Sequence, residues 1–184
     1  MIKLNGAAQR EFKFASDVTT AMQYFGVLSQ VIEYLPHIDL VETYGPNEVR
    51  VRYSTLELGA YTINIITDLQ CQVDEETLSI VIRPLKGKDP VKSEASLNST
   101  IGYGYFTSAA FLSKCEEGTL IDFRLKLMAN LPRPRGLRMM PGRVVNRIAG
   151  SLSQGRVNEI MDGFMANAIG AFPAWMADQE PAGL

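Results

Sequence analysis

The chain has 184 residues, enough for one well-buried core and too few for us to expect more than a single domain spanning 1–184. Hydrophobic residues make up 46% and charged residues 21%, an ordinary globular balance that argues against disorder. The net charge of −2 hides an uneven distribution, because Phe123 to Arg156 holds eight basic residues and no acidic one.

Features that are absent from the sequence indicate where the protein is located and whether it binds a metal. The N-terminus has no apolar run of the kind found in signal peptides, and no stretch reaches the roughly 18 apolar residues of a membrane span. Cys71 and Cys115 belong to no CxxC or Cys/His cluster, so neither a zinc site nor a disulfide framework is indicated. We therefore expect a soluble, cytoplasmic protein without metal or cofactor.

The first elements are a strand and two short helices. Gln9 to Phe14 alternates and predicts a strand. Ser16 or Asp17 can cap a helix over Val18 to Phe25. Gly26 breaks this helix, and a second short one is predicted over Leu28 to Tyr34.

A run of strands follows. Tyr61 to Val73 has the clearest period of two, with apolar side chains on one face and polar ones on the other, as in an antiparallel sheet covered on one face only. Residues 85–98 are expected to form a loop, and the inward face of Ile101 to Leu112 is not fixed by its pattern. The other strands are predicted at Ile38–Tyr44, Val49–Tyr53, Leu78–Ile82 and Ile121–Leu127.

The C-terminal segment carries two apolar helical stripes that are out of step. One stripe ends at Leu152 and the next begins at Val157, a step of five residues that swings the apolar face nearly to the opposite side. Glycine and serine residues occupy 150–155, where helices tend to bend or stop. The pattern predicts a short helix over Gly142 to Ala149, a break, and a long helix to about Trp175.

This order of elements resembles the START/SRPBCC helix-grip superfamily, which includes birch-pollen-allergen-like proteins, lipid-transfer domains and polyketide cyclases. The segment that looks like the superfamily's second helix reads VLSQVIEYLPHI. A closer similarity, to a family of unknown function from cyanobacteria and plastids, is carried by LMANLPRPRGLRMMP and by a helix ending in FPAW. The implied fold is α+β: a curved seven-stranded antiparallel sheet, two short helices after the first strand, and a long C-terminal helix.

The resemblance implies an apolar cavity between the sheet and the last helix. The inward stripes would line it, with tyrosines as polar handles. The alternative is that the same residues pack into a filled core. The candidate ligand-binding residues are Tyr53, Tyr61, Ile63, Ile65, Leu69, Ile80, Ile82, Tyr103, Tyr105, Phe123, Leu125, Met161, Phe164, Met165 and Ala168.

Catalysis has little support in the sequence. His37 is the only histidine, and beside Pro36 at a helix exit we expect its side chain to be solvated or locally bonded. The pairs Glu75/Glu76 and Glu116/Glu117 fall in predicted turns, where carboxylates are usually just solvated. No catalytic residue is proposed, and a cyclase- or hydrolase-like enzyme is kept as the third hypothesis.

The arginine-rich segment from 133 to 147 is the polar feature that differs most from the rest of the chain, which is acidic. Arginines interleaved with Met and Leu suit an anionic membrane surface, although a simply solvated face is an alternative. Nucleic acid is disfavoured, because the chain as a whole is acidic and no aromatic side chains interleave with the arginines. The candidate docking residues are Arg133, Arg135, Arg138, Met139, Met140, Arg143 and Arg147.

The leading hypothesis is therefore a non-enzymatic module that binds an apolar small molecule, lipid or pigment-like, beneath its final helix. The second hypothesis is a peripheral factor that docks on membranes or on a protein complex through the arginine-rich segment.

Overall fold

The computed structural model describes residues 1–89 and 91–179, so residue 90 of the predicted loop and the last five residues lie outside the described part. The elements, in chain order, are β1 (Ile2–Phe14), α1 (Val18–Phe25), α2 (Leu28–Glu33), β2 (Ile38–Gly45), β3 (Glu48–Glu57), β4 (Tyr61–Asp74), β5 (Ser79–Pro84), β6 (Glu94–Ala95), β7 (Ser99–Cys115), β8 (Gly118–Leu131), the 3₁₀ turn η1 (Arg135–Leu137) and α3 (Gly142–Gln179).

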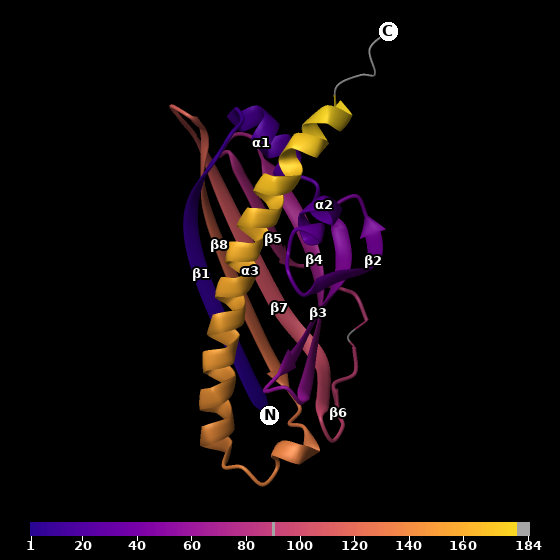
Figure 1. The fold of residues 1–184 in the computed structure, drawn as a ribbon. Coiled ribbons are helices and arrows are strands. Elements are labelled where there is room, and N and C mark those ends of the chain that lie inside the picture. The colour runs from indigo at the N-terminus through magenta and orange to yellow at the C-terminus, as the bar shows by residue number, and fades with distance from the viewer. Residues whose placement is uncertain (90, 180–184) are drawn as a thin grey trace.

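The strands form one sheet in the order β1-β8-β7-β5-β4-β3-β2, with the two-residue β6 paired to β7. All neighbouring pairs are antiparallel except β4 and β7, which also pair in parallel over 62–66 and 99–103. The parallel pairing lies along the part of β4 that β5, which ends at Pro84, does not reach. The predicted helix-grip architecture is confirmed (Figure 1).

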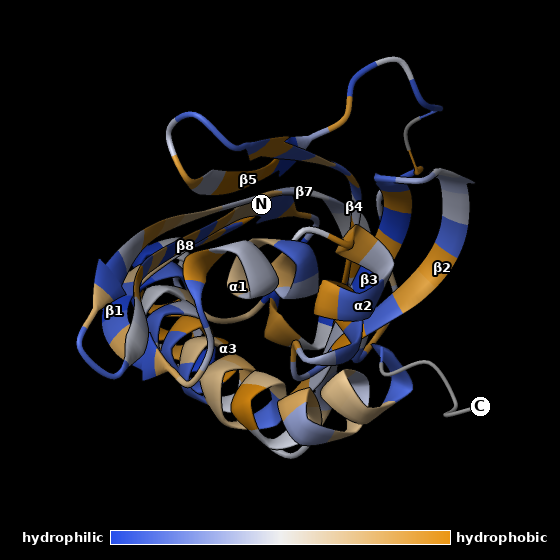
Figure 2. Cartoon of the chain, turned by 90° about the horizontal axis from the view of Figure 1, so that it is seen from above, coloured by the Kyte–Doolittle hydropathy of each residue, from blue (hydrophilic) through white to orange (hydrophobic). Residues whose placement is uncertain are grey.

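All three helices lie on the same side of the curved sheet, as the view from above shows (Figure 2). The first helix starts at the predicted position because the Asp17 side chain accepts hydrogen bonds from the amide and the hydroxyl of Thr20, at 3.0 and 2.8 Å. None of the described helices combines the length and the apolar character that a membrane crossing requires.

The prediction of a break near 150–155 is wrong, because α3 is one continuous helix. Ala149 and Ser153 are buried as well and connect the two apolar stripes in steps of four residues, from Val145 to Val157. Ser153 is tolerated on the buried face because its hydroxyl donates to the Ala149 carbonyl at 2.6 Å. The buried positions of α3 are Val145, Ala149, Ser153, Val157, Ile160, Met161, Phe164 and Ala168.

Small residues are required at this point because α3 packs closely on β1. A Cβ atom added to Gly6 would lie 2.7 Å from Val157 Cγ2 and 2.9 Å from the Ser153 carbonyl oxygen. A methyl group would meet nothing within 4 Å at either Gly150 or Gly155, so these glycines do not mark a packing site. The change of stripe predicted to be a break is therefore a place where helix and strand lie close together.

Helix α3 also covers the outer edge of β1, which would otherwise expose unpaired backbone groups. The amide of Lys3 donates to Asn146 Oδ1 at 3.3 Å, and the amide of Ala7 donates to Gln154 Oε1 at 3.3 Å. Gln154 Nε2 donates back to the Ala7 carbonyl at 2.8 Å. The N-terminal half of α3 is thereby held along the sheet edge.

Several predicted boundaries also differ from those of the structure. The first strand begins at Ile2 rather than Gln9, and its whole length pairs with β8, from Ile2–Leu131 to Phe14–Thr119. The predicted loop over 85–98 contains β6.

Candidate ligand-binding site

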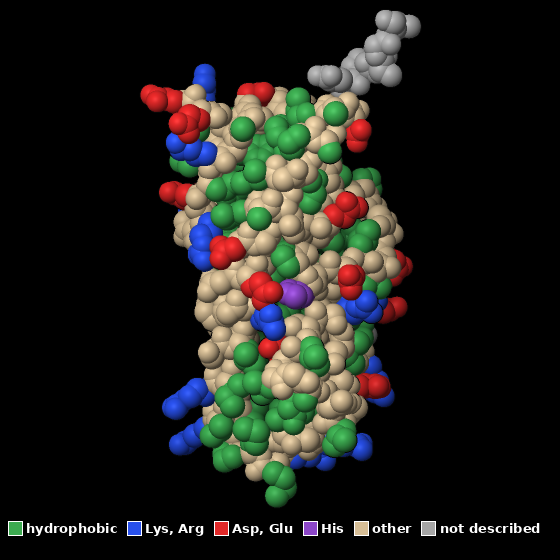
Figure 3. Space-filling model, in the orientation of Figure 1, with side chains coloured by type: hydrophobic (Ala, Val, Ile, Leu, Met, Phe, Trp, Pro, Cys, Tyr) green, Lys and Arg blue, Asp and Glu red, His purple; other side chains and the backbone are tan. Residues whose placement is uncertain are grey.

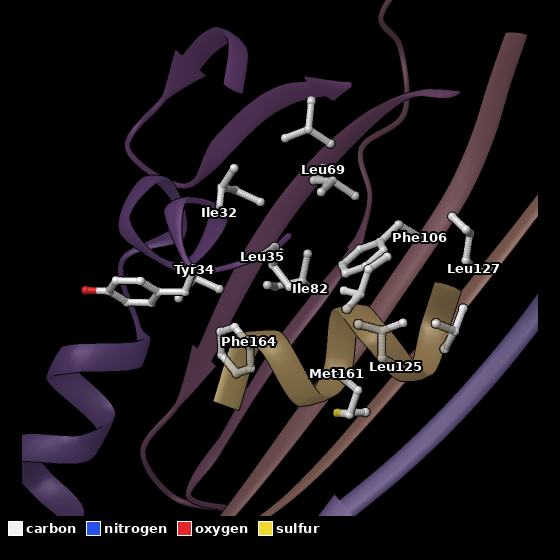
Figure 4. Packing of buried hydrophobic residues seen from close by; sticks show 14 of the residues in the cluster. Ile32, Tyr34, Leu35, Leu69, Ile82, Phe106, Leu125, Leu127, Met161 and Phe164 are labelled. Atoms are coloured by element: carbon white, nitrogen blue, oxygen red, sulfur yellow. The ribbon is translucent and has the colours of Figure 1, made fainter. Parts of the chain in front are cut away.

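The space between α3 and the sheet has two parts that differ in how well they are filled. The upper part, at the C-terminal half of α3, holds an aromatic cluster. Phe164 lies 4.7 Å from Phe123 and Phe172 lies 4.5 Å from Phe14, measured between ring centroids. Figure 4 shows Phe164 and Met161 among buried side chains of the sheet and of the α2 region. The space left in this part is only about 20 Å³, beside Phe25, Ile80 and Phe164, and we call this part the filled core.

Polar contacts fix the upper part further. The Tyr24 hydroxyl donates to the Ala168 carbonyl at 2.7 Å, and Asn167 Nδ2 donates to the Tyr34 carbonyl at 3.0 Å. Burial, reinforced by Tyr34, raises the pKa of Tyr24, so its hydroxyl stays a neutral donor. Helices α1 and α2 are thus tied to the C-terminal half of α3.

The lower part, at the N-terminal half of α3, encloses an apolar cavity of about 70 Å³. Its sheet side is formed by Ile2 and Leu4 of β1 with Ile63 of β4, and its helix side includes Ile148 and Leu152. The cavity reaches the surface between α3 and the β3–β4 turn. The rim residues, as we call them, are the exposed Leu58 and the half-exposed Leu137 and Met140.

The lining is almost wholly apolar, but polar side chains stand on one side of it, and we call this side the polar wall. Glu57, only 4% exposed, accepts from the Thr55 hydroxyl at 3.0 Å and from Arg156 Nε at 2.9 Å, both through Oε1. Its other oxygen, Oε2, has only a 3.5 Å contact with Arg156 Nη2. Because a carboxylate oxygen can accept two hydrogen bonds, Oε2 keeps acceptor capacity.

The polar wall continues to the surface. Arg156 also bonds Glu159, and Glu159 Oε1 lies 2.8 Å from His37 Nε2. Bonds from His37 and then Arg156 lower the pKa of Glu159, and the bonds to Glu57 and Glu159 raise the pKa of Arg156. These four residues form the central ion cluster, which joins β3 and the α2–β2 link to the middle of α3; its histidine and acidic and basic groups are visible mid-molecule in Figure 3.

The structure divides the candidate ligand-binding residues predicted from the sequence. Only Tyr53, Tyr61 and Ile63 line the cavity. The remaining inward residues pack in the filled core or against it: Ile65, Leu69, Ile80, Ile82, Phe123, Leu125, Met161, Phe164, Met165 and Ala168.

Tyr103 and Tyr105, the other two candidate polar handles, do not line the cavity, so their assignment as ligand-binding residues is wrong. In β7 the inward positions are those of Gly102, Gly104 and Phe106, so the alternating tyrosines face outward. Tyr105 is exposed, and the Tyr103 hydroxyl bonds Asp68 on the outer face at 3.2 Å.

Asp68 belongs to the polar face of the Tyr61–Val73 pattern, which was expected to be exposed to solvent. In the structure it is fully buried. Arg50 donates to both of its oxygens at 2.7 and 2.9 Å, and Tyr44 and Tyr103 donate as well. Burial opposes ionisation of Asp68, but these bonds outweigh it and lower its pKa. Arg50 also donates to the Asp89 carbonyl, so the cluster fastens the β5–β6 link over the sheet. It is separate from the cavity.

The candidate docking residues are also divided. Arg133 turns inward and donates to the Met140 carbonyl, and Met140 lines the cavity. The other five are exposed: Arg135, Arg138, Met139, Arg143 and Arg147.

No protein-family model and no curated protein matches the chain. Solved structures do. The protein TTHA0849 from Thermus thermophilus aligns with a TM-score of 0.52 at 14% identity, over 91% of this chain and 98% of its own. A conserved protein from Geobacillus kaustophilus aligns at 0.53 and 8% identity, over 93% and 96%. The Streptomyces aromatase/cyclase Zhui aligns at 0.49 and 9%, over 98% and 99%. At these identities the likeness is one of fold.

Metal chemistry finds no support in the described part of the chain, where no group of three His, Cys, Asp or Glu side chains is placed to hold an ion. Cys71 is half-buried, and burial raises the pKa of its thiol to about 11, which leaves it protonated at neutral pH. The site therefore consists of an apolar cavity, one polar wall and an opening beside α3.

Proposed function

We propose that the protein binds an apolar small molecule with one polar end in the cavity beneath the N-terminal half of α3, without transforming it. The observation that carries this proposal is the contrast within the space beneath α3: the upper half is packed with aromatic rings and keeps about 20 Å³, whereas the lower half keeps an apolar space of about 70 Å³ beside the polar wall. The closer similarity to cyanobacterial and plastid proteins stays a prediction.

The polar wall favours a particular kind of polar end. Glu57 Oε2 has spare acceptor capacity, so a ligand hydroxyl or amine can donate to it. A ligand carboxylate would instead add a negative charge beside Glu57 and Glu159, which share the one guanidinium of Arg156. An alcohol should therefore bind more tightly than the acid of equal length.

The cavity must open further for a long ligand, because about 70 Å³ is small beside the roughly 300 to 1,000 Å³ of typical ligand sites. The rim offers a way to do this. Met140 is an unbranched, adaptable side chain, and Leu58 is already exposed. Displacement of these side chains would lengthen the cavity towards solvent without disturbing the filled core.

Binding without catalysis agrees with the placement of the polar groups. The carboxylate and guanidinium on the cavity wall are bonded to each other, and the only histidine of the chain, His37, bonds Glu159 and is not among the cavity-lining residues.

Titration calorimetry with a series of straight-chain alcohols, and with the carboxylic acids of equal length, tests the proposal. Affinity should rise with each methylene, worth about 0.8 kcal/mol when fully buried, until the cavity is full. Alcohols should bind at least about tenfold more tightly than acids, which corresponds to a difference in binding free energy of roughly 1.4 kcal/mol. In the Glu57→Gln variant the ratio of alcohol affinity to acid affinity should be smaller.

Leu152→Trp, which fills the cavity from the helix side, should weaken alcohol binding by about tenfold or more. Ile169→Trp is the matched control, since Ile169 is an exposed aliphatic residue of the same helix outside the cavity. Equal alcohol affinity in the two folded variants would show that the cavity is not the binding site.

A further inference from the structure

Five large apolar side chains are exposed at the end of the molecule where the cavity opens: Met1, Leu58, Leu97, Met139 and Val144. Met139 is 95% exposed, the highest value among them. Figure 3 shows hydrophobic side chains gathered at this lower end, with basic groups around them. We call this surface the apolar tip.

The fold brings these residues together from five separate segments. Ile2 pairs with Leu131, which places the N-terminus beside the end of β8. The Gly136 amide donates to the Leu97 carbonyl at 2.8 Å, and the Thr62 amide donates to the Asn98 carbonyl at 2.9 Å. The turn before β7 is thereby held against both η1 and the start of β4.

Four exposed arginines lie around the apolar tip: Arg135, Arg138, Arg143 and Arg147. Within residues 1–89 and 91–179, none of them lies within ion-pair distance of a carboxylate. The N-terminus of α3 points towards the same end, and its first turn holds no acidic residue to offset the helix dipole. Uncompensated positive charge therefore surrounds exposed apolar side chains.

We propose that this end of the molecule docks on an anionic membrane surface. Lipid headgroups supply the negative charge for the arginines, and the interfacial region accepts side chains such as Met139 and Leu97. Nucleic acid would satisfy the charge alone, leaving the apolar side chains in water. The exposed aromatic residues that could stack on bases, Tyr105 and Phe111, lie on the outer face of β7.

Docking in this orientation brings the cavity opening to the bilayer. Leu58 belongs both to the apolar tip and to the rim of the cavity. A ligand dissolved in the membrane would then reach the cavity without crossing water. This extension rests on the proposed function; the docking itself does not.

Co-sedimentation of ligand-free protein with vesicles tests the docking. Vesicles of phosphatidylcholine with about 30% phosphatidylserine should bind the protein at least about tenfold more strongly than pure phosphatidylcholine, and salt should weaken this binding because exposed charges are screened. Changing Arg135, Arg138, Arg143 and Arg147 to Gln should abolish the preference, and Met139→Asp should weaken binding to both kinds of vesicle.

The control changes four exposed basic residues elsewhere, Lys13, Arg83, Lys114 and Lys126, to Gln, with the same change in net charge. This control should bind anionic vesicles several-fold more strongly than the arginine variant. Equal binding of the two variants would overturn the proposal, as would tighter binding of the wild type to single-stranded DNA than to vesicles. Leu152→Trp should bind vesicles like the wild type, so a failure of the cavity hypothesis and a failure of docking remain distinguishable.

Discussion

The two halves of α3 pack on the sheet in different ways. The C-terminal half packs large side chains such as Phe164 and Phe172 into an aromatic cluster with α1 and the sheet. The N-terminal half presents Ala149 and Ser153 to β1, so that helix and strand backbones lie close together at the sheet edge. The half that approaches the edge most closely is also the one that leaves a space towards β3 and β4. A helix held along one edge can leave part of the sheet uncovered.

The largest expected difference between the halves is in the response to truncation. Phe164→Ala removes a ring from a filled core and should lower the free energy of unfolding by about 3 to 5 kcal/mol. Leu152→Ala removes a half-exposed side chain beside an existing cavity and should cost less than about 1 kcal/mol. Denaturant unfolding measures both, and similar costs would contradict the division into a filled and an open half.

An effect of intermediate size is expected where α3 approaches β1. Gly6→Val would place atoms within 3 Å of the Ser153 carbonyl and should destabilise the protein by about 1 to 3 kcal/mol. Gly155→Ala is the control on the free side of the helix, where it should stabilise by up to about 1 kcal/mol. Thermal unfolding would decide the matter: if Gly6→Val were neutral, the close approach would not constrain the fold.

The smallest effect is expected at the central ion cluster between the two halves. The lowered pKa of Glu159 means that the folded state favours its charged form. This contribution is present above the unfolded value of 4.5 and is lost as the pH falls through the folded pKa. Because Glu159 is partly exposed, we expect Glu159→Gln to cost about 0.2 to 1 kcal/mol near neutral pH. The difference in free energy of unfolding between the variant and the wild type should vanish at pH values below the folded pKa of Glu159. A difference that persists at low pH would contradict the electrostatic origin.

The alternation of the strands and the helix-grip order could be predicted from the sequence because both follow from local periodicity. Phe12 and Phe14, Val49 and Val51, and the stripe from Tyr61 onward all face inward as expected. These faces are set by which side chains are apolar, and the pattern is unambiguous wherever one face is polar.

The details of α3 and of the site could not be predicted, because they depend on contacts between distant segments. Ser153 lies in the buried stripe opposite Gly6, and as a polar residue it does not mark the stripe by itself. Asp68 is buried because Arg50 meets it from the neighbouring strand. In β7 both faces carry apolar residues; the small inward glycines were the available signal, since Gly104 packs against Ile65.

Side-chain methyl NMR during titration with 1-octanol tests the central claim most directly. If the ligand enters the space beneath the N-terminal half of α3, the methyl signals of Ile2, Leu4, Ile63 and Ile148 should shift together and saturate with one affinity. The signals of Ile80 and Ile82, in the filled upper half, should stay in place. Shifts confined to Ile80 and Ile82, with the cavity methyls unmoved, would contradict the account.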